Sequence, residues 1–172
     1  MLYGKLELLD AMQPYQGGGD MIDKVSFDGT TFAKPPARFE AGTPHISGAI
    51  GLGAAVDYVS QFNFDEMHAY ESSLREKLEA GLKNIPGMQI YGEASEKVSV
   101  TSFLIDGIHS HDMATFLDAE NMCIRAGHHC CQPLMTHYGI AGTARASLAF
   151  YNTEAEVDRF VAVIRKIQQF FG

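Results

Sequence analysis

The sequence predicts an α/β fold in which a small sandwich of helices and strands follows an irregular N-terminal quarter. Strand-like and helix-like segments alternate from residue 88 onward. Two long amphipathic helices each begin with a capping signal. The length of 172 residues suits one domain with at most an appendage, and is enough to bury a hydrophobic core.

The first quarter of the chain predicts a helix and a hairpin. Residues 5–12 are compatible with a helix, and three consecutive glycines at 17–19 predict a flexible turn. Residues 21–27 and 30–40 have strand-like composition around Asp28-Gly29, a hairpin turn signal. Because prolines at 35 and 36 interrupt the second arm, we expect an edge or a projecting hairpin.

Two helices are predicted in the middle of the chain. Residues 46–60 are apolar and rich in Ala and Gly, which suggests a buried helix whose backbone approaches a neighbour closely. The second helix begins at Asn63, with Glu66 three residues later as in a capping box, and ends before Pro86-Gly87. Its apolar stripe consists of Met67, Tyr70, Leu74, Leu78, Leu82 and Ile85.

The remaining residues predict alternating elements. Strands are expected at residues 88–91, 98–105, 122–126 and 144–150, and short helices at 110–120, capped by Ser110, and 134–138. Cys123 lies among apolar residues and is expected in the core. A last helix starts with the capping box of Thr153 and Glu156 and carries the stripe Val157, Phe160, Val161, Ile164, Ile167 and Phe171.

Charge and cysteine content narrow the function classes. Twenty-one acidic and 13 basic residues give a net charge of -8, which disfavours nucleic-acid binding. The longest stretch without Asp, Glu, Lys or Arg, residues 41–56, is shorter than the ~20 residues of a membrane-spanning helix. No secretory signal is visible, and three cysteines do not suggest a disulfide framework. We therefore expect a cytoplasmic protein.

Reactive and charged side chains are most concentrated in residues 125–133, which read RAGHHCCQP. Arg125 and two imidazoles precede the thiols of Cys130 and Cys131, and nearby cations favour a reactive thiolate. A loop with incidental histidines and buried cysteines is an equally good interpretation. A metal site is disfavoured because contiguous side chains point in different directions, and adjacent His129 and Cys130 fit a papain-like pair poorly.

Two further places have both a functional and a structural interpretation. Arg145 lies in a strand opposite an apolar face, where its planar fork could bind a carboxylate or form a surface salt bridge. Gly42-Thr43-Pro44 could be a simple turn before the helix at 46–60, or its backbone and hydroxyl could meet a phosphate.

Several of these motifs, in the same order along the chain, resemble one family. They are Arg125-Ala-Gly-His-His-Cys130, Gln132-Pro-Leu-Met135, Arg145-Ala-Ser-Leu-Ala149, Tyr151-Asn-Thr153, Gly17-Gly-Gly-Asp-Met-Ile22, Arg38-Phe-Glu-Ala-Gly-Thr-Pro44 and Ile50-Gly-Leu-Gly-Ala-Ala55. The chain resembles over nearly its whole length the C-terminal part of group II, SUF-type cysteine desulfurases of the class V aminotransferase family. The resemblance implies the α+β small C-terminal domain of a fold-type I pyridoxal-phosphate enzyme. In that domain a few-stranded, mostly antiparallel sheet packs against helices. An N-terminal segment with a hairpin and a helix precedes it.

The resemblance also implies an activity. Members are homodimeric enzymes that take sulfur from L-cysteine and leave L-alanine. They hold the sulfur as a cysteine persulfide for a sulfur-acceptor protein in iron–sulfur cluster assembly, and some act on selenocysteine. Cys130 would be the nucleophile, Arg145 would pair with the substrate carboxylate, and Arg125 would shape the active-site entrance. Thr43, next to Gly42, would reach the phosphate of pyridoxal phosphate in the opposite subunit, and no metal is implied. Cys131 has no role that the resemblance assigns.

The same resemblance suggests how the chain divides. Residues 1–62 would be a remnant of the large cofactor-binding domain with a dimer-interface hairpin and helix, and residues 63–172 the small domain with the cysteine loop. The family's cofactor lysine lies in a Ser-Gly-His-Lys segment that this sequence lacks. We therefore expect a C-terminal fragment that forms no Schiff base with pyridoxal phosphate by itself, is inactive alone, and exposes apolar surface on the helix near 46–59. The alternative is a non-catalytic α/β domain that self-associates or binds a sulfur acceptor.

Overall fold

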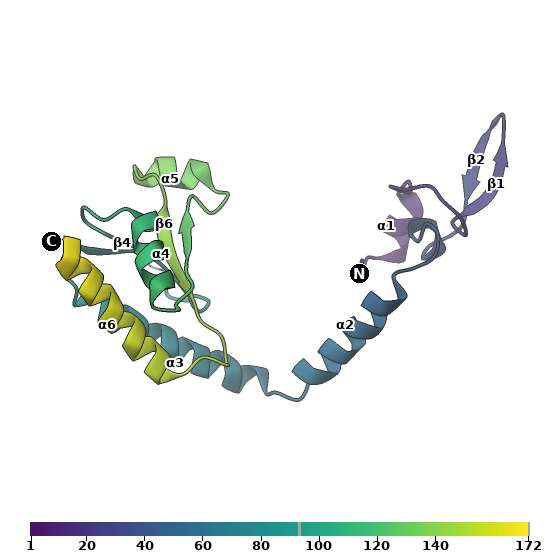
Figure 1. Cartoon of the computed structure of the whole chain (residues 1–172). Coiled ribbons are helices and arrows are strands. Elements are labelled where there is room, and N and C mark those ends of the chain that lie inside the picture. The colour runs from purple at the N-terminus through teal and green to yellow at the C-terminus, as the bar shows by residue number, and fades with distance from the viewer. Residues whose placement is uncertain (93, 172) are drawn as a thin grey trace. The chain divides into compact units, whose positions relative to one another are not determined.

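The structure is a computed structural model that describes residues 1–92 and 94–171. The chain forms two compact units, Met1–Gln61 and Phe62–Gly172. Helices and short antiparallel sheets make up both, which confirms the predicted α/β class (Figure 1).

The first unit contains the predicted helix and hairpin. Helix α1 spans Leu6–Ala11, and strand β1 (Ile22–Ser26) pairs antiparallel with β2 (Gly29–Phe32) across a tight turn. The second arm is shorter than the 30–40 predicted. It ends at Phe32, and a 3-10 turn, η1 (Ala37–Phe39), follows the Pro35-Pro36 pair, because proline lacks the N–H that a strand ladder needs.

Arg38 joins the hairpin base to α1. Its Nε donates to the carbonyl oxygen of Ala33 at 2.9 Å, and its Nη1 donates to those of Asp10 at 2.7 Å and Met12 at 3.2 Å. A guanidinium has five donors in a fixed fork, so it can hold several chain segments at once. The irregular backbone of this unit is therefore organised by one arginine as well as by apolar contacts.

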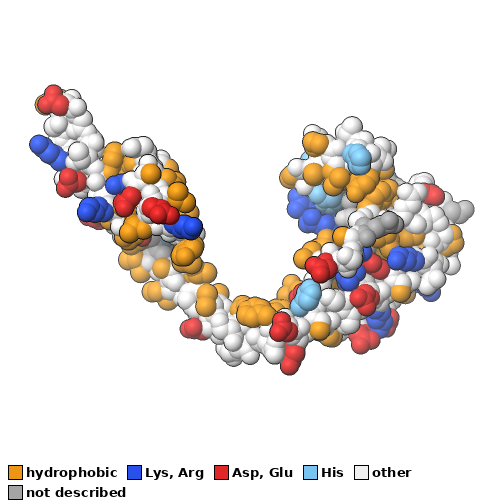
Figure 2. Space-filling model, turned by 180° about the vertical axis from the view of Figure 1, so that it is seen from behind, with side chains coloured by type: hydrophobic (Ala, Val, Ile, Leu, Met, Phe, Trp, Pro, Cys, Tyr) orange, Lys and Arg blue, Asp and Glu red, His pale blue; other side chains and the backbone are white. Residues whose placement is uncertain are grey.

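Helix α2 (Ile46–Val59) forms as predicted, but the expectation that it is buried is wrong for this chain. None of its residues is buried, and apolar side chains lie along it (Figure 2). Gly51 and Gly53 also face open space and do not approach a neighbouring backbone. The exposed apolar surface expected on this helix is thus present, at Ile46, Ile50, Leu52, Val56, Tyr58 and Val59.

The second unit is a four-stranded antiparallel sheet packed against helices (Figure 1). Strand order is β3-β4-β6-β5, and the strands are β3 (Met88–Tyr91), β4 (Val100–Ile105), β5 (Arg125–Gly127) and β6 (Thr143–Ser147). Its helices are α3 (Phe64–Lys83), α4 (Ser110–Ala119), α5 (Gln132–Tyr138) and α6 (Glu154–Phe171).

The core lies between the sheet and helices α3, α4 and α6. The predicted stripes supply it, and its fully enclosed members include Leu74, Leu78, Leu82, Phe103, Met113, Leu117, Ala144, Val157 and Ile164. Tyr70 and Phe171, at the ends of their stripes, stay exposed. A Cβ added at Gly81 would lie 2.8 Å from Val161, so α3 and α6 are close enough to require glycine there.

The helix starts agree with the capping signals in two of three cases. Asn63 accepts hydrogen bonds from the backbone N–H groups of Asp65 and Glu66 at 3.0 and 3.3 Å. Thr153 and Glu156 form the reciprocal capping box. The prediction that Ser110 caps α4 is wrong: Ser110 is buried inside the helix, and His109 Nδ1 accepts from the N–H of His111 at 3.3 Å.

Two strands are shifted relative to the prediction. β5 begins at Arg125 instead of 122, and β6 ends at Ser147 instead of 150. Cys123 precedes β5 and is exposed, so its predicted core position is wrong. Its side chain lines a surface hollow of ≈ 290 Å³ with Leu148 and Phe160, whereas Met122 and Ile124 pack against the core.

A buried ionic cluster joins α3 to the sheet. The Glu79 carboxylate accepts from Lys97 Nζ at 2.7 Å and from the Thr101 hydroxyl at 3.3 Å, and lies 3.5 Å from Arg75 Nη1. Burial is the largest influence on Glu79 and acts to raise its pKa. The hydrogen bond from Lys97 and the charges of Lys97 and Arg75 together outweigh burial, so the pKa lies below the ordinary 4.5.

We predict that Glu79→Gln lowers the free energy of unfolding at pH 7 by about 1–3 kcal/mol, since it removes charge-assisted hydrogen bonds from a buried site. The depressed pKa means that the contribution is complete above pH 4.5 and is lost as the pH falls through the folded-state value. Urea unfolding at several pH values measures it. The control is Glu76→Gln, an exposed partner of Arg75, which should cost under about 1 kcal/mol. Equal losses at both positions would contradict the prediction.

Candidate active site

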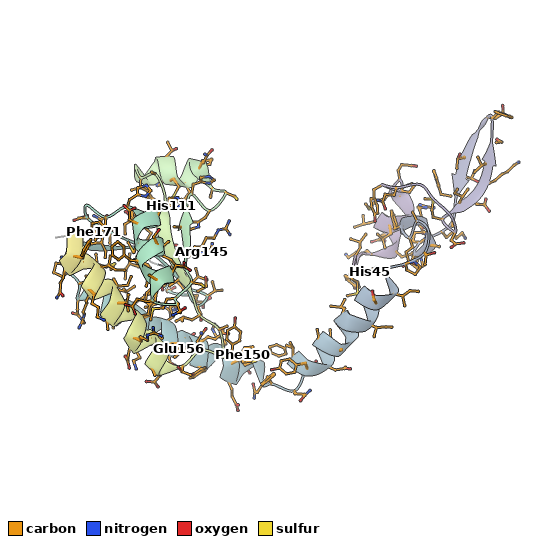
Figure 3. All side chains as sticks on the ribbon, viewed as in Figure 1. His45, His111, Arg145, Phe150, Glu156 and Phe171 are labelled. Atoms are coloured by element: carbon orange, nitrogen blue, oxygen red, sulfur yellow. The ribbon has the colours of Figure 1, made fainter. Side chains whose placement is uncertain are left out.

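Two arginines face each other across the last strand pair of the sheet. In the register of β5 and β6, Arg125 is the partner of Arg145. Ala144 and Ala146 on either side of Arg145 are buried in the core, so both arginines lie on the sheet face opposite helices α3, α4 and α6. Figure 3 labels Arg145 on the opposite side of the sheet from α6. Directly opposed like charges destabilise a sheet, so an anion bound between them would be favourable.

Arg145 keeps unused hydrogen-bonding capacity. It is half-buried, and its Nε is buried without a hydrogen-bond partner among the described residues. A buried donor without a partner costs roughly 1–3 kcal/mol, and native structures retain few of them. The location predicted from sequence, in a strand opposite an apolar face, is confirmed.

The cysteine loop leaves β5 and returns to β6 at adjacent positions, because Gly127 pairs with Thr143. Gly127 has a φ of 118°, which favours glycine, and a Cβ at Gly142 would lie 2.6 Å from the Gly127 carbonyl oxygen. Both glycines are therefore required where the two ends of the loop meet.

Cys130 lies at the exposed corner of this loop. It and His129 have positive φ values of 57° and 54°, which are uncommon for residues other than glycine. The Cys130 N–H donates to His128 Nδ1 at 3.1 Å, and Arg125 Nη2 donates to the Cys130 sulfur at 3.8 Å. An exposed sulfur with a guanidinium beside it is suited to carry negative charge.

His129 attaches the loop to β6. Its Nε2 is 3.1 Å from the carbonyl oxygen of Thr143 and 2.9 Å from the Thr143 hydroxyl. Since a carbonyl only accepts, Nε2 carries the proton. Burial and the charge of Arg145 lower the pKa of His129 below 6.5, although the Thr143 carbonyl opposes them. His129 is therefore neutral at pH 7 and is not a cation beside the thiols.

This role of His129 was not predicted from the sequence. The sequence shows His129 only as a neighbour of Cys130, and Thr143 lies 14 positions later. The closing glycines at 127 and 142 are the one available signal, because they indicate where the two ends of the loop approach each other.

The candidate phosphate ligands lie in the first unit. Gly42 has a φ of 73°, and its N–H donates to the Gly19 carbonyl at 2.9 Å. Thr43 is exposed, and its hydroxyl has no hydrogen-bond partner in the described residues. Both line a hollow of that unit with Tyr15, Pro36 and Phe39. The structure thus brings Arg125, Cys130 and Arg145 together in one unit and places Gly42 and Thr43 in the other.

The sequence model of one family matches most of the chain. It is described as "Aminotransferase class-V" and matches residues 1–160. The chain belongs to the aminotransferase class-V family.

Curated members of this family extend the comparison. The chain is 48% identical over 171 residues to a probable cysteine desulfurase of Xylella fastidiosa, covering 99% of this chain and 41% of the relative. It is 47% identical over 173 residues to a cysteine desulfurase of Pectobacterium carotovorum, covering 100% and 42%. The chain therefore spans about two fifths of the length of the curated relatives it matches. The resemblance to cysteine desulfurases is confirmed.

Solved structures agree with this assignment. The cysteine desulfurase CsdA of Escherichia coli, in an S-sulfonic acid form, matches with a TM-score of 0.92 and 38% identity, over 99% of this chain and 42% of that chain. The apo cysteine desulfurase of Thermococcus onnurineus NA1 matches with a TM-score of 0.90 and 38% identity, over 98% and 42%.

Neither a metal-ligand cluster nor a membrane-spanning helix is present among the described residues. No group of three or more His, Cys, Asp or Glu side chains in residues 1–92 and 94–171 is arranged to hold a metal ion. None of the helices described is long and apolar enough to cross a membrane.

We predict that the His129 ring carries its proton on Nε2 and titrates below pH 6.5, because it is partly buried and lies near the charge of Arg145. Nitrogen–proton correlation spectra of the imidazole across pH 5–8 measure both properties. The neutral form is favoured in the folded state, so its stabilisation is complete above pH 6.5 and is lost as the pH falls toward the folded-state pKa.

Two variants of Thr143 test its hydrogen bond to His129. Thr143→Val should cost about 1 kcal/mol or more of stability because it removes a buried hydroxyl, whereas Thr143→Ser should cost less. A His129 midpoint above 6.5, or equal effects of Val and Ser, would contradict the assignment.

Proposed function

We propose that this chain forms the sulfur-accepting and carboxylate-binding part of a pyridoxal-phosphate-dependent cysteine desulfurase. The supporting observation is the grouping of Cys130 with Arg125 and Arg145 at the end of one strand pair. A thiol that accepts sulfur and an arginine that binds the substrate's carboxylate have to act on the same small molecule. Their common origin in β5, β6 and the loop between them meets that need.

Arg145 is the residue we assign to the substrate carboxylate. A carboxylate accepts two parallel hydrogen bonds from a guanidinium, and Arg145 has a buried Nε without a protein partner. Arg125 opposite it already contacts the Cys130 sulfur. This division leaves one arginine for the carboxylate and the other for the thiol at the entrance of the site.

Cys130 is assigned as the sulfur acceptor. Its sulfur would bond to the sulfur of L-cysteine while the substrate's carbon–sulfur bond breaks. The carbon would keep the bonding electrons and take up a proton, which leaves L-alanine and a Cys130 persulfide. The exposed corner of the loop allows the sulfur to meet both the substrate and a sulfur-acceptor protein, and the guanidinium of Arg125 stabilises charge on it. Neutral His129 holds the base of the loop on β6, so the corner extends from a fixed point.

Gly42 and Thr43 of the first unit could supply some of the contacts that the phosphate of pyridoxal phosphate needs. Thr43 offers an exposed hydroxyl, and the positive φ of Gly42 shapes the turn that presents it. When bound, pyridoxal phosphate would act as an electron sink at the substrate's α-carbon and so make the adjacent carbon–sulfur bond easier to break. The sequence has no Ser-Gly-His-Lys segment to hold the cofactor covalently. We propose that Gly42 and Thr43 bind it in a partner subunit of a homodimer.

The proposed division of labour follows the two units. Residues 1–62 would belong to the cofactor-binding domain and contribute the hairpin and α2 to the dimer. Residues 63–172 would form the small domain. The apolar residues exposed along α2 support an interface role for the first segment.

A chimera tests this function. The N-terminal part of the Pectobacterium carotovorum relative, joined to this chain in place of the matching 42%, should convert L-cysteine to L-alanine. Cys130→Ser should abolish sulfur transfer. Arg145→Gln should raise KM by about tenfold to a hundredfold, since charged hydrogen bonds contribute about 1.5–3 kcal/mol. Alanine formation and protein-bound sulfane sulfur are the two readouts.

Two controls accompany the chimera. Cys123→Ser changes an exposed thiol outside the loop and should leave turnover unchanged. The 172-residue chain alone, mixed with pyridoxal phosphate and L-cysteine, should release no alanine. Activity of the chain alone would contradict its assignment as one part of a larger catalytic unit, and full sulfur transfer by the Cys130→Ser chimera would contradict the role of Cys130.

A further inference from the structure

Cys131 is a second exposed thiol directly beside Cys130, and the function proposed above does not use it. Its sulfur has no hydrogen-bond partner among the described residues. Its backbone is well held, because its N–H donates to the His128 carbonyl at 2.9 Å and its carbonyl accepts from Leu134 at 3.1 Å and from Met135 at 3.3 Å. The thiol is therefore accessible, unpaired and carried by an ordered segment.

We propose that Cys131 is a second sulfur carrier, which takes the sulfane sulfur from Cys130 and presents it to the acceptor. This inference rests on the proposed function, in which Cys130 receives the sulfur first. The two thiols would act as a relay on one loop.

The two thiols are on consecutive residues of the loop. Their Cα atoms are about 3.8 Å apart, and the relay requires the two side chains to rotate toward each other. Cys130 has a φ of 57° at the corner, and Cys131 has a φ of -131° as the chain turns into α5. Both side chains are exposed, so neither has to leave the protein core for a sulfur atom to pass between them.

The contact with Arg125 gives the transfer a direction. Thiol exchange is faster when the leaving sulfur is better stabilised as a thiolate. Arg125 Nη2 donates to the Cys130 sulfur at 3.8 Å and no described donor contacts that of Cys131. Cys130 therefore has a contact that stabilises it as the leaving thiolate, and Cys131 has none among the described residues.

The step balances without a further reactant. The Cys131 thiol gives its proton to solvent, and its sulfur attacks the terminal sulfur of the Cys130 persulfide. A new sulfur–sulfur bond forms at Cys131 while the bond at Cys130 breaks, and Cys130 leaves as a thiolate beside Arg125. Cys131 is oxidised to the persulfide as Cys130 is reduced to the thiol, so no outside oxidant or reductant is needed.

Loading the 172-residue chain with limiting inorganic polysulfide tests the relay. A Cys123→Ser background leaves only the two loop thiols. Samples are quenched with iodoacetamide over time and digested with trypsin, and the peptide of residues 126–145 is fragmented between its two cysteines. Sulfane sulfur should appear first on Cys130 and then on Cys131. With Cys130→Ser, Cys131 should gain sulfur about tenfold more slowly or worse, because intramolecular delivery is lost.

The other outcomes are separable. Three outcomes would overturn the relay and leave the proposed function intact. The sulfur could stay on Cys130, or Cys131 could gain sulfur equally fast in the Cys130→Ser variant. The third outcome is release of hydrogen sulfide with formation of a Cys130–Cys131 disulfide. Loading of Cys130 no faster than Cys123, measured in the chain with its native cysteines, would count against both. Cys131→Ala should slow sulfur transfer from the chain to added N-acetylcysteine, and an unchanged rate would likewise overturn the relay.

Discussion

The antiparallel pairing of β5 with β6 is the constraint on which the candidate site depends. It sets Arg125 opposite Arg145 on the sheet face away from the core, and it sets Gly127 opposite Thr143, where the cysteine loop begins and ends. The two buried alanines beside Arg145 hold this register, because a slip by one residue would place a guanidinium in the core. Arg125, Arg145 and the two ends of the cysteine loop are therefore positioned by the same ladder.

The loop combines a fixed base with an exposed corner. At the base, His129 bonds to Thr143, and the backbones at Gly127 and Gly142 meet without room for a side chain. At the corner, His129 and Cys130 both have positive φ, and the Cys130 side chain that follows the His129 anchor is exposed. Positive φ values in residues other than glycine cost energy and are concentrated at functional sites. A held segment beside an exposed corner suits the sulfur-transfer role proposed for Cys130.

The sequence predicted the elements that depend on local pattern. The stripes of α3 and α6, the capping box of Thr153 and Glu156, and the hairpin signal at Asp28-Gly29 all correspond to observed structure. The errors occur where neighbours distant in sequence decide. Cys123 looks like a core residue from its apolar neighbours but lies at the surface. Helix α2 has the composition of a buried helix, yet nothing in its own unit covers it.

By itself the sequence determined the class of fold, the helices with regular apolar periodicity, and the candidate residues Arg125, Cys130 and Arg145. These follow from local periodicity and from motifs that can be read along the chain. Only the tertiary structure decided that Arg125 and Arg145 are cross-strand partners, that the Arg125 guanidinium contacts Cys130, and that His129 is a neutral anchor on Thr143. Strand register, burial and the pKa of a side chain all depend on contacts between distant segments, and no local pattern specifies those contacts.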